Sequence, residues 1–322
     1  MTTIETPLTT LYQGDARDVL LTLADESVQT VVTSPPYWGL RDYGVDGQIG
    51  LEPTPELYVE NMVSIFREVR RVLRSDGTLW LNMGDSYAGS GAGGGGNRKG
   101  NEHGQHNAVA KKGRPSALPT HKPKDLVGIP WRLAFALQAD GWYLRSDIIW
   151  SKPNPMPESV QDRPTKAHEY IFLLTKSARY YYDAEAIKET ASNAGNAISL
   201  GQKSFSKRQA LGANVLPSGN GLHDTYTVPD RRNKRSVWEI PTQPYSEALF
   251  ATFPEALVRP CILAGTSEAG VVLDPFAGSG TTLAVATSLG RKSIGIELSD
   301  EYMEIARKRI TKQTPALPME TV

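Results

Sequence analysis

Hydrophobic and polar positions alternate along the C-terminal part of the chain in a pattern that predicts strands and helices in turn. The apolar run at residues 271–274 predicts a strand, residues 283–289 a helix, and residues 291–298 the next strand. Ser299 then begins an amphipathic helix with acidic residues in its first turn and basic residues near its end. These elements form a β-α-β-α unit, which we expect to be right-handed with parallel strands.

The N-terminal half supplies the rest of a sheet, since two strands cannot make one that is buried on both faces. Strands are predicted at 8–12, 28–33, 78–82, 142–150 and 170–174, and helices at 16–23, 55–73 and 131–137. The apolar face of the helix at 55–73 consists of Leu57, Val59, Met62, Ile65, Phe66, Val69, Val72 and Leu73. The predicted fold is a doubly wound, mainly parallel α/β sheet with a smaller irregular region.

Two segments interrupt this pattern. Residues 86–122 are rich in glycine with scattered basic residues, and residues 190–236 are polar without aliphatic periodicity. Neither composition can build a packed core, so we expect the first to be a flexible loop. The predicted divisions are 1–85, 86–122, 123–176, 177–240 and 241–322.

Composition fits a globular protein of 322 residues, with 39% hydrophobic and 22% charged residues. No stretch reaches the roughly 18 apolar residues of a membrane span. The N-terminus has neither a basic start nor an apolar core, so no membrane association and a cytoplasmic location are expected. A single cysteine, Cys261, agrees with a reducing compartment.

The formal net charge is zero, which by itself disfavours a nucleic-acid partner, but the charge is unevenly distributed. Residues 1–83 and 238–322 together carry nine more acidic than basic residues, and residues 84–237 carry nine more basic than acidic ones. The neutral total therefore predicts a polarised molecule whose basic segments meet a polyanion.

The turn after the strand at 271–274 has the chemistry of a nucleoside-binding loop. Asp274-Pro275-Phe276-Ala277-Gly278-Ser279-Gly280-Thr281-Thr282 follows a strand and opens a helix. No lysine follows Gly280 to reach a phosphate, and Leu283 occupies the place of the third small residue in a dinucleotide fingerprint. Glu297 ends the next strand, where it could bind ribose hydroxyls. We expect a nucleoside ligand without pyrophosphate.

This loop and Thr33-Ser34-Pro35-Pro36-Tyr37-Trp38 together resemble the amino-group DNA methyltransferases that use S-adenosylmethionine (AdoMet). The order, catalytic motif first and AdoMet loop last, resembles their β group. Weaker motifs extend the resemblance: Gly14-Asp15-Ala16, 77–85, 150–155, His168-Glu169 and 251–255. The resemblance implies that residues 1–85 and 123–176 form the catalytic half, 177–240 the target-recognition region and 241–322 the AdoMet-binding half.

The tetrapeptide Ser34-Pro35-Pro36-Tyr37 is the implied catalytic motif. An exocyclic base amine is a poor nucleophile, because its lone pair is delocalised into the ring. Hydrogen bonds accepted from the amine by the Ser34 hydroxyl and the Pro35 carbonyl would favour a more nucleophilic nitrogen. The two prolines fix φ, and Tyr37 can stack on a base that has left the duplex. The implied reaction is direct methyl transfer, in which alignment supplies much of the catalysis.

The resemblance also implies the remaining site residues and the partners. Cofactor-binding residues are Asp15, Thr33, Phe253, Asp274, Phe276, Ala277, Gly278, Ser279, Gly280, Thr281, Thr282 and Glu297. DNA-binding residues are Trp38, Arg41, Lys203, Lys207, Arg208, Arg231, Arg232, Lys234 and Arg235. The expected partners are double-stranded DNA and either a cognate restriction endonuclease or none, with the protein a monomer or homodimer.

Alternatives remain for the substrate. The segment Thr33 to Trp38 most resembles cytosine-N4 enzymes, while adenine N6 is also an aromatic amine that a serine hydroxyl can accept from. More distant alternatives are an RNA or protein-glutamine methyltransferase and a non-catalytic DNA-binding module.

Several reactive side chains favour structural roles. Cys261 follows a proline, as a cytosine-C5 nucleophile does, but we expect it to be a small core residue in a helix. The isolated histidines predict no metal site. Asp15 either binds the cofactor or caps its helix, and His168-Glu169 is expected to order the following strand.

Overall fold

A computed structural model describes residues 2–40, 44–88, 121–192, 194–195, 197–200, 224–227, 229–243 and 253–313. The chain forms two compact units, Met1–Asp183 with Ser236–Val322, and Ala184–Arg235. The larger unit contains β1 (Thr3–Glu5), β2 (Thr9–Gln13), α1 (Ala16–Thr22), β3 (Val28–Thr33), α2 (Pro55–Val72), β4 (Leu73–Met83), α3 (Ile129–Ala139), β5 (Tyr143–Ser151), β6 (His168–Thr175), β11 (Val237–Glu239), α5 (Glu255–Gly265), β12 (Val271–Asp274), α6 (Thr281–Ser288), β13 (Lys292–Glu297) and α7 (Asp300–Gln313).

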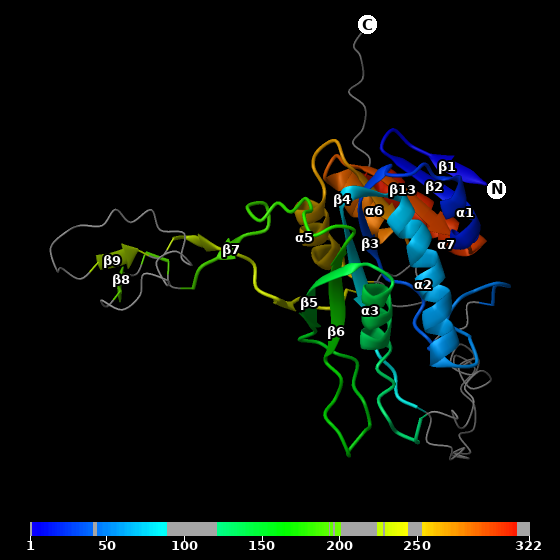
Figure 1. The fold of residues 1–322 in the computed structure, drawn as a ribbon, viewed down its shortest axis with the longest axis horizontal. Helices are drawn as coiled ribbons and strands as arrows, with labels where there is room; N and C mark the ends of the chain where they lie inside the picture. Colours follow the sequence, from blue (N-terminus) through cyan, green and yellow to red (C-terminus); the bar gives the residue numbers. More distant parts are fainter. Residues whose placement is uncertain are drawn as a thin grey trace, which may run out of the picture. The chain divides into compact units, whose positions relative to one another are not determined.

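One sheet crosses the larger unit in the order β1-β2-β13-β12-β3-β4-β6-β5-β11 (Figure 1). The C-terminal strands β12 and β13 lie between the N-terminal strands β2 and β3, and all four are parallel. β4 continues the parallel set, β6 runs antiparallel to β4 and β5, and β1 is antiparallel to β2. The predicted doubly wound, mainly parallel sheet is therefore confirmed.

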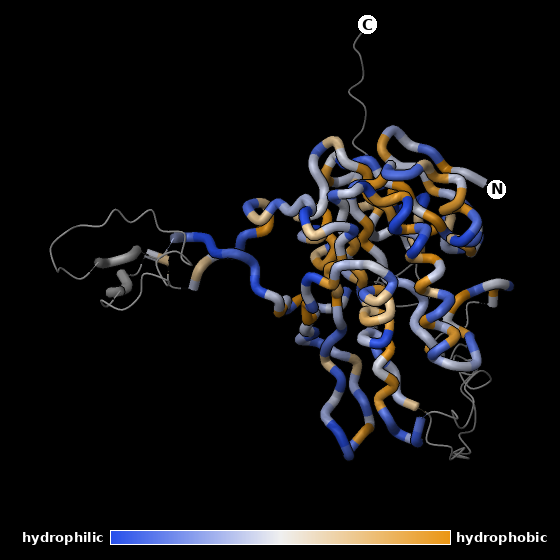
Figure 2. Tube along the Cα trace, viewed as in Figure 1, coloured by the Kyte–Doolittle hydropathy of each residue, from blue (hydrophilic) through white to orange (hydrophobic). Residues whose placement is uncertain are grey.

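Helices cover both faces of this sheet. α1, α2 and α3 pack against one another on one face, and α5, α6 and α7 do so on the other. Hydrophobic residues gather in the larger unit along the sheet and its covering helices (Figure 2). β3 leads through α2 to β4, and β12 leads through α6 to β13, so the strand order reverses between β3 and β12. In such sheets the crevice at a reversal point lies at the carboxyl ends of the strands and is the usual ligand site.

β3 is buried at every position, as expected of a central strand with helices on both sides. Its buried Thr30 forms a hydrogen bond to the neighbouring strand β4, with Thr30 Oγ1 2.8 Å from Thr78 Oγ1. Gly265, at the end of α5, lies against this pair, since a Cβ added there would come within 2.6 Å of both hydroxyl oxygens. The lack of a side chain at Gly265 thus allows α5 to approach the sheet closely.

Helix α2 starts where the sequence predicts. Thr54 caps it by accepting a hydrogen bond from Leu57 N, and Pro55 occupies the first helical turn. The predicted apolar face is wrong at one position, because Leu57 is 39% exposed whereas Tyr58 is fully buried. Leu57 lies in the first turn of the helix, and Tyr58 turns inward, where its hydroxyl donates to the Pro36 carbonyl at 2.8 Å.

The smaller unit has two short antiparallel pairs, β7 (Glu189–Thr190) with β10 (Arg231–Arg232), and β8 (Ala197–Leu200) with β9 (Asp224–Thr227). It falls within residues 177–240, whose role in target recognition stays a prediction. Within the described ranges, no helix combines the length and apolar character that a membrane crossing requires.

The burial difference within one predicted apolar face gives a matched test. We expect Leu73→Ala to lower the free energy of unfolding by about 2–5 kcal/mol, because Leu73 is fully buried and a cavity remains. Leu57→Ala should cost less than about 1 kcal/mol, because that side chain is already partly exposed to water. Urea unfolding of both variants checks this, and equal losses would contradict the packing described for α2.

Candidate active site

A cavity of about 460 Å³ lies at the reversal point between β3 and β12. Residues from both ends of the chain line it, because the carboxyl ends of these neighbouring parallel strands meet at the same edge. The predicted site residues that line it are Asp15, Ser34, Pro35, Pro36, Tyr37, Phe253, Phe276, Ala277, Gly278, Ser279, Thr281 and Glu297. Thr33, Asp274, Gly280 and Thr282 lie next to the cavity in sequence but do not line it.

The glycine loop between β12 and α6 takes a conformation that favours glycine. Gly278 and Gly280 have φ values of +52° and +75°. A Cβ added at Gly280 would come 2.9 Å from the Cβ of Ala306, so α7 packs directly against the loop. Gly280 therefore serves the packing of the loop, and Gly278 serves its turn at the cavity wall.

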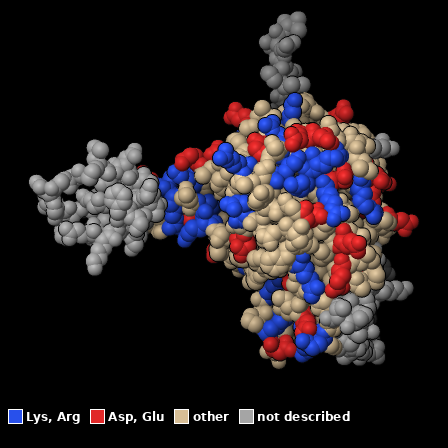
Figure 3. All heavy atoms as spheres, in the orientation of Figure 1, with Lys and Arg blue, Asp and Glu red and all other residues tan. Residues whose placement is uncertain are grey.

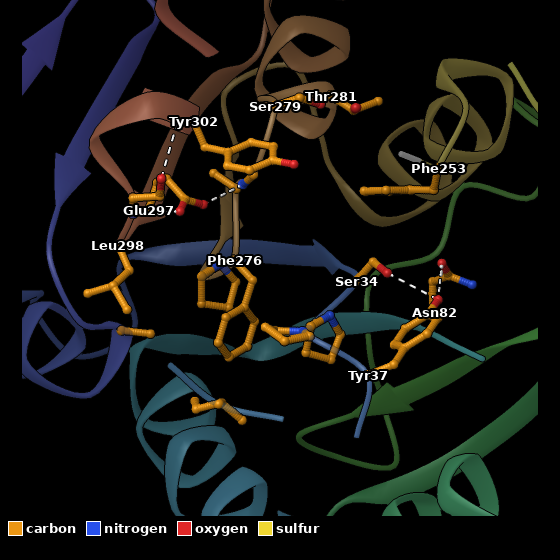
Figure 4. Close-up of a pocket in the computed structure, with 18 of the residues that line it drawn as sticks. Ser34, Tyr37, Asn82, Phe253, Phe276, Ser279, Thr281, Glu297, Leu298 and Tyr302 are labelled. Carbon is orange, nitrogen blue, oxygen red and sulfur yellow. Dashed lines mark hydrogen bonds between the residues drawn. The ribbon is translucent and has the colours of Figure 1, made fainter. Parts of the chain in front are cut away.

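Glu297 fixes this loop from the end of β13. Its Oε2 accepts a hydrogen bond from Gly278 N, and its Oε1 accepts one from Ser299 N, both at 2.8 Å. Burial raises the pKa of the Glu297 carboxyl, although hydrogen bonds from the backbone oppose this. Figure 4 shows Glu297 bonded to the loop, on the same side of the pocket as Phe276 and Leu298.

Asp274 stabilises the glycine loop through hydrogen bonds and does not line the cavity. Its Oδ1 accepts hydrogen bonds from Thr33 Oγ1 at 2.7 Å and from Phe276 N at 3.1 Å. Complete burial raises the pKa of Asp274 to about 6, against the opposing effect of hydrogen bonds from Thr33 and Phe276. Asp274 thus joins β3 to the glycine loop, and a direct contact with a ligand is not what its position indicates.

Asp15 is placed for both roles that the sequence left open, capping of α1 and contact with a ligand in the cavity. It is the N-cap of α1, accepting a hydrogen bond from Arg17 N at 2.8 Å, and it also lines the cavity. Hydrogen bonds and charge from Arg17 hold the pKa of Asp15 below its usual value, although burial alone would raise it.

The turn after β3 carries the predicted catalytic motif. The Pro36 carbonyl is held by Tyr58, and Trp38 Nε1 donates to the Glu52 carbonyl at 2.8 Å. Trp38 is 7% exposed and belongs to the hydrophobic core, a position that gives no support to its predicted contact with DNA. The large apolar ring is needed for packing beneath the turn. Arg41 lies outside the described residues.

Tyr37 is the centre of a hydrogen-bonded cluster on the catalytic side of the cavity (Figure 4). Its hydroxyl accepts a hydrogen bond from Ser34 Oγ at 3.3 Å, and lies 2.8 Å from Glu169 Oε2 and 3.1 Å from Asn82 Oδ1. Lys152 forms an ion pair with the other oxygen of Glu169.

A glycine allows Tyr37 to take this place. A Cβ added at Gly84 would come 2.6 Å from Tyr37 Cε2. The turn after β4 therefore has room for the aromatic ring only because position 84 carries no side chain.

His168-Glu169 begins β6, the strand that these residues were expected to order, and Glu169 also lines the cavity. Asn82 and Lys152 line it as well, although sequence analysis gave them no role. All three stand at strand ends that reach one edge of the sheet, because β6 is antiparallel to β4 and β5. Their position at strand ends was the signal in the sequence that could have identified these three residues. Using that signal required knowledge of the strand directions.

The charge of the cavity limits its ligands. Among the described residues that line it, Lys152 is the single Lys or Arg, and it is paired with Glu169. Asp15, Glu169 and Glu297 provide three carboxylates. This set does not suit a polyphosphate and does suit a nucleoside that carries positive charge.

Other reactive side chains have structural roles. Cys261 is buried in α5 and its thiol donates to the Leu257 carbonyl, which confirms it as a core residue. His168 packs edge-on against Tyr170. In the described part of the chain, no group of His, Cys, Asp or Glu side chains is arranged to hold a metal ion.

The predicted DNA-binding arginines of the smaller unit are held by acceptors of that unit. Arg232 and Arg235 both form ion pairs with Glu189, and Arg231 donates to the Lys188 carbonyl at 3.0 Å. Lys234 lies on the same segment, and Lys203, Lys207 and Arg208 lie outside the described residues. On the face of the larger unit in Figure 3, basic and acidic side chains are interspersed.

Comparison with known proteins reveals extensive similarity. The model of a family described as DNA methylase matches residues 28–308. Type II methyltransferase M.SmaI of Serratia marcescens is 48% identical over 300 residues, covering 93% of this chain and 90% of that protein. Type II methyltransferase M.SfiI of Streptomyces fimbriatus is 32% identical, covering 91% of this chain and 89% of that protein.

Two solved structures share the fold. A putative DNA modification methylase of Thermus thermophilus, in complex with S-adenosyl-L-methionine, has a TM-score of 0.59 at 23% identity, covering 95% of each chain. The PvuII DNA methyltransferase (cytosine-N4-specific) has a TM-score of 0.62 at 18% identity, covering 96% of this chain and 92% of that chain.

The raised pKa of Asp274 predicts a pH-dependent stability. The folded protein holds this proton more tightly than the unfolded chain, so stability present below the unfolded pKa is lost as pH rises through the folded pKa. The change from 3.8 to about 6 corresponds to roughly 3 kcal/mol of unfolding free energy. Asp274→Asn can keep both hydrogen bonds accepted by Oδ1 and should lack this loss.

Urea unfolding between about pH 4 and pH 7 checks this prediction. The gap in unfolding free energy between Asp274→Asn and the unsubstituted protein should change by that amount, whereas Asp18→Asn, at an exposed carboxylate, should show no such change. Parallel pH curves for Asp274→Asn and the unsubstituted protein would contradict the assignment.

Proposed function

Because this chain belongs to the DNA methylase family and is an amino-group DNA methyltransferase of the β group, we propose that it methylates the exocyclic N4 of cytosine in duplex DNA, using AdoMet. The observation that carries the proposal is the single cavity shared by the Ser34-Pro35-Pro36-Tyr37 turn and the glycine loop. A base amine at the turn and a nucleoside cofactor at the loop would meet there without an intermediate carrier.

The residues of the loop half fit AdoMet. Glu297 offers acceptors for ribose hydroxyls, Phe276 and Leu298 offer apolar surface for a purine ring, and Asp15 adds a carboxylate suited to a cationic ligand. The lack of a lysine or arginine among the described lining residues of the loop agrees with a nucleoside that has no phosphate. When bound, AdoMet supplies a methyl group activated by its positively charged sulfur.

The catalytic half prepares the amine. Ser34 and Pro35 line the cavity, and the Ser34 hydroxyl and the Pro35 carbonyl can both accept hydrogen bonds from an exocyclic NH₂. Accepting these bonds draws electron density back onto the nitrogen and aims its lone pair at the loop half. The rigid prolines keep the acceptors in place, so orientation contributes a large part of the rate.

The target base has to leave the duplex to reach this cavity, since the amine is otherwise paired and stacked. Cytosine is proposed over adenine because the segment Thr33 to Trp38 resembles that of cytosine-N4 enzymes. Both bases present an aromatic amine, so product analysis decides between them.

DNA recognition is proposed for the basic residues of the stretch 84–237, and reading of the target sequence for residues 177–240. Its arginines and lysines have the chemistry for phosphate and guanine contacts. Relatives such as M.SmaI are named Type II methyltransferases, and we extend to this chain a role in protecting DNA beside a restriction endonuclease.

Product analysis tests the proposed function. Purified protein and AdoMet are incubated with duplex DNA of varied sequence, and the nucleosides are then identified by mass spectrometry. N4-methylcytosine in duplex DNA is expected, and N6-methyladenine would overturn the choice of base. Ser34→Ala should lower the methylation rate at least ~100-fold with AdoMet affinity unchanged, since it removes only an acceptor for the amine.

AdoMet binding tests the loop half separately. We expect Glu297→Gln to raise the Kd for AdoMet about 10- to 100-fold, because charge-assisted hydrogen bonds to ribose and to the loop become neutral. Glu301→Gln, in the exposed first turn of α7, is the matched control and should leave Kd unchanged. Isothermal titration calorimetry measures both, and equal affinities for both variants would exclude Glu297 from the cofactor site.

A further inference from the structure

Glu169 is a carboxylate inside the catalytic half of the cavity for which the mechanism above has no use. It stands at the start of β6, and its side chain is 16% exposed. We propose that Glu169 is a positioning residue that acts through Tyr37 and fixes the hydroxyl of Ser34 as a hydrogen-bond acceptor for the base amine. The inference rests on the proposed function only in requiring an exocyclic amine as substrate.

A serine hydroxyl can face a base amine in two ways, and only one helps. With its proton directed away, Ser34 Oγ offers lone pairs to the NH₂ group, and with its proton directed at the amine it opposes an N–H donor. Something next to Ser34 has to take its proton. Ser34 Oγ lies 3.3 Å from Tyr37 Oη, which is placed to accept it.

A tyrosine hydroxyl has one proton. Tyr37 can accept a hydrogen bond from Ser34 only if it donates its own proton to another group. Tyr37 Oη lies 2.8 Å from Glu169 Oε2 and 3.1 Å from Asn82 Oδ1. The carboxylate is both the nearer and the charged acceptor, and charge-assisted hydrogen bonds are the stronger ones. Tyr37 therefore donates to Glu169, which leaves a lone pair of Oη for the proton of Ser34.

The surroundings hold Glu169 in this role. Lys152 pairs with Oε1, and Asn82 Nδ2 donates to Oε2 at 3.2 Å and to the Tyr170 carbonyl at 3.1 Å. Lys152 Nζ also lies 4.2 Å from the centre of the Trp150 ring. Both oxygens of Glu169 thus face donors, and a carboxylate can only accept, so the direction of the whole chain from Ser34 to Glu169 is set at this residue.

A glutamine at position 169 would remove this direction. Its amide can donate to Tyr37 Oη, after which Tyr37 can donate to Ser34, and the serine proton then points to the amine. Tyr37→Phe breaks the same chain at its middle while keeping the ring that packs against Gly84.

A double-mutant cycle on the full chain tests the proposal. Glu169→Gln and Tyr37→Phe should each lower the single-turnover methylation rate about 10- to 100-fold. The double variant should be no slower than the slower single variant, because both changes break one chain. KM for DNA and Kd for AdoMet should stay within about threefold of the unsubstituted values, a split that a general loss of structure would not give.

The exposed Glu60→Gln, on α2 and outside the cavity, is the matched control and should keep the full rate. A double variant whose loss equals the product of the two single losses would overturn the proposal, as would a full rate in Tyr37→Phe. If Glu169→Gln does not fold, the methylation rate of Tyr37→Phe alone still tests the proposal. If the product is N6-methyladenine, the choice of cytosine fails while this test stands, since adenine also presents an exocyclic amine.

Discussion

The parallel hydrogen bonding between β3 and β12 is the contact that positions every other part of the site. Val272 and Leu273 pair with Thr30 and Val31, and they join strands that lie near opposite ends of the sequence. Parallel strands end at the same edge, so this one pairing brings the turn that carries Ser34 beside the glycine loop. A second parallel pairing, of β13 with β2, joins the same two ends of the chain on the other side of β12.

Buried polar groups tie the two halves together at this junction. Asp274 accepts from Thr33 of β3, and Thr282 of α6 donates to the Val32 carbonyl at 3.1 Å. A carboxylate kept out of water costs free energy, which its raised pKa reflects. In return, these hydrogen bonds hold β3 and the glycine loop in one geometry. Alignment of two reactants requires such a fixed geometry.

The catalytic half depends on a reversal of strand direction. β6 runs antiparallel to β4 and β5, so its first residues lie at the edge where β4 and β5 end. Glu169 at the start of one strand thereby meets Asn82 and Lys152 at or just beyond the ends of two others. A carboxylate, an amide and an ammonium from three segments converge on Tyr37, and the direction of its hydroxyl follows from their charges.

Local sequence is enough to define most elements of the larger unit and the two chemical motifs, but it did not predict the three-residue strands β1 and β11. Periodicity placed α2 and β3 within one residue of their observed bounds. The loop from Asp274 to Thr282, together with Glu297, indicated a nucleoside site. Both predictions were possible because short-range hydrogen bonding and backbone preferences depend on neighbouring residues. Tertiary packing was needed to establish that Trp38 is buried, that Leu57 faces water and that Glu169 enters the cavity. Burial and strand direction depend on which distant segments pack together, and no local pattern at those three positions carries that information.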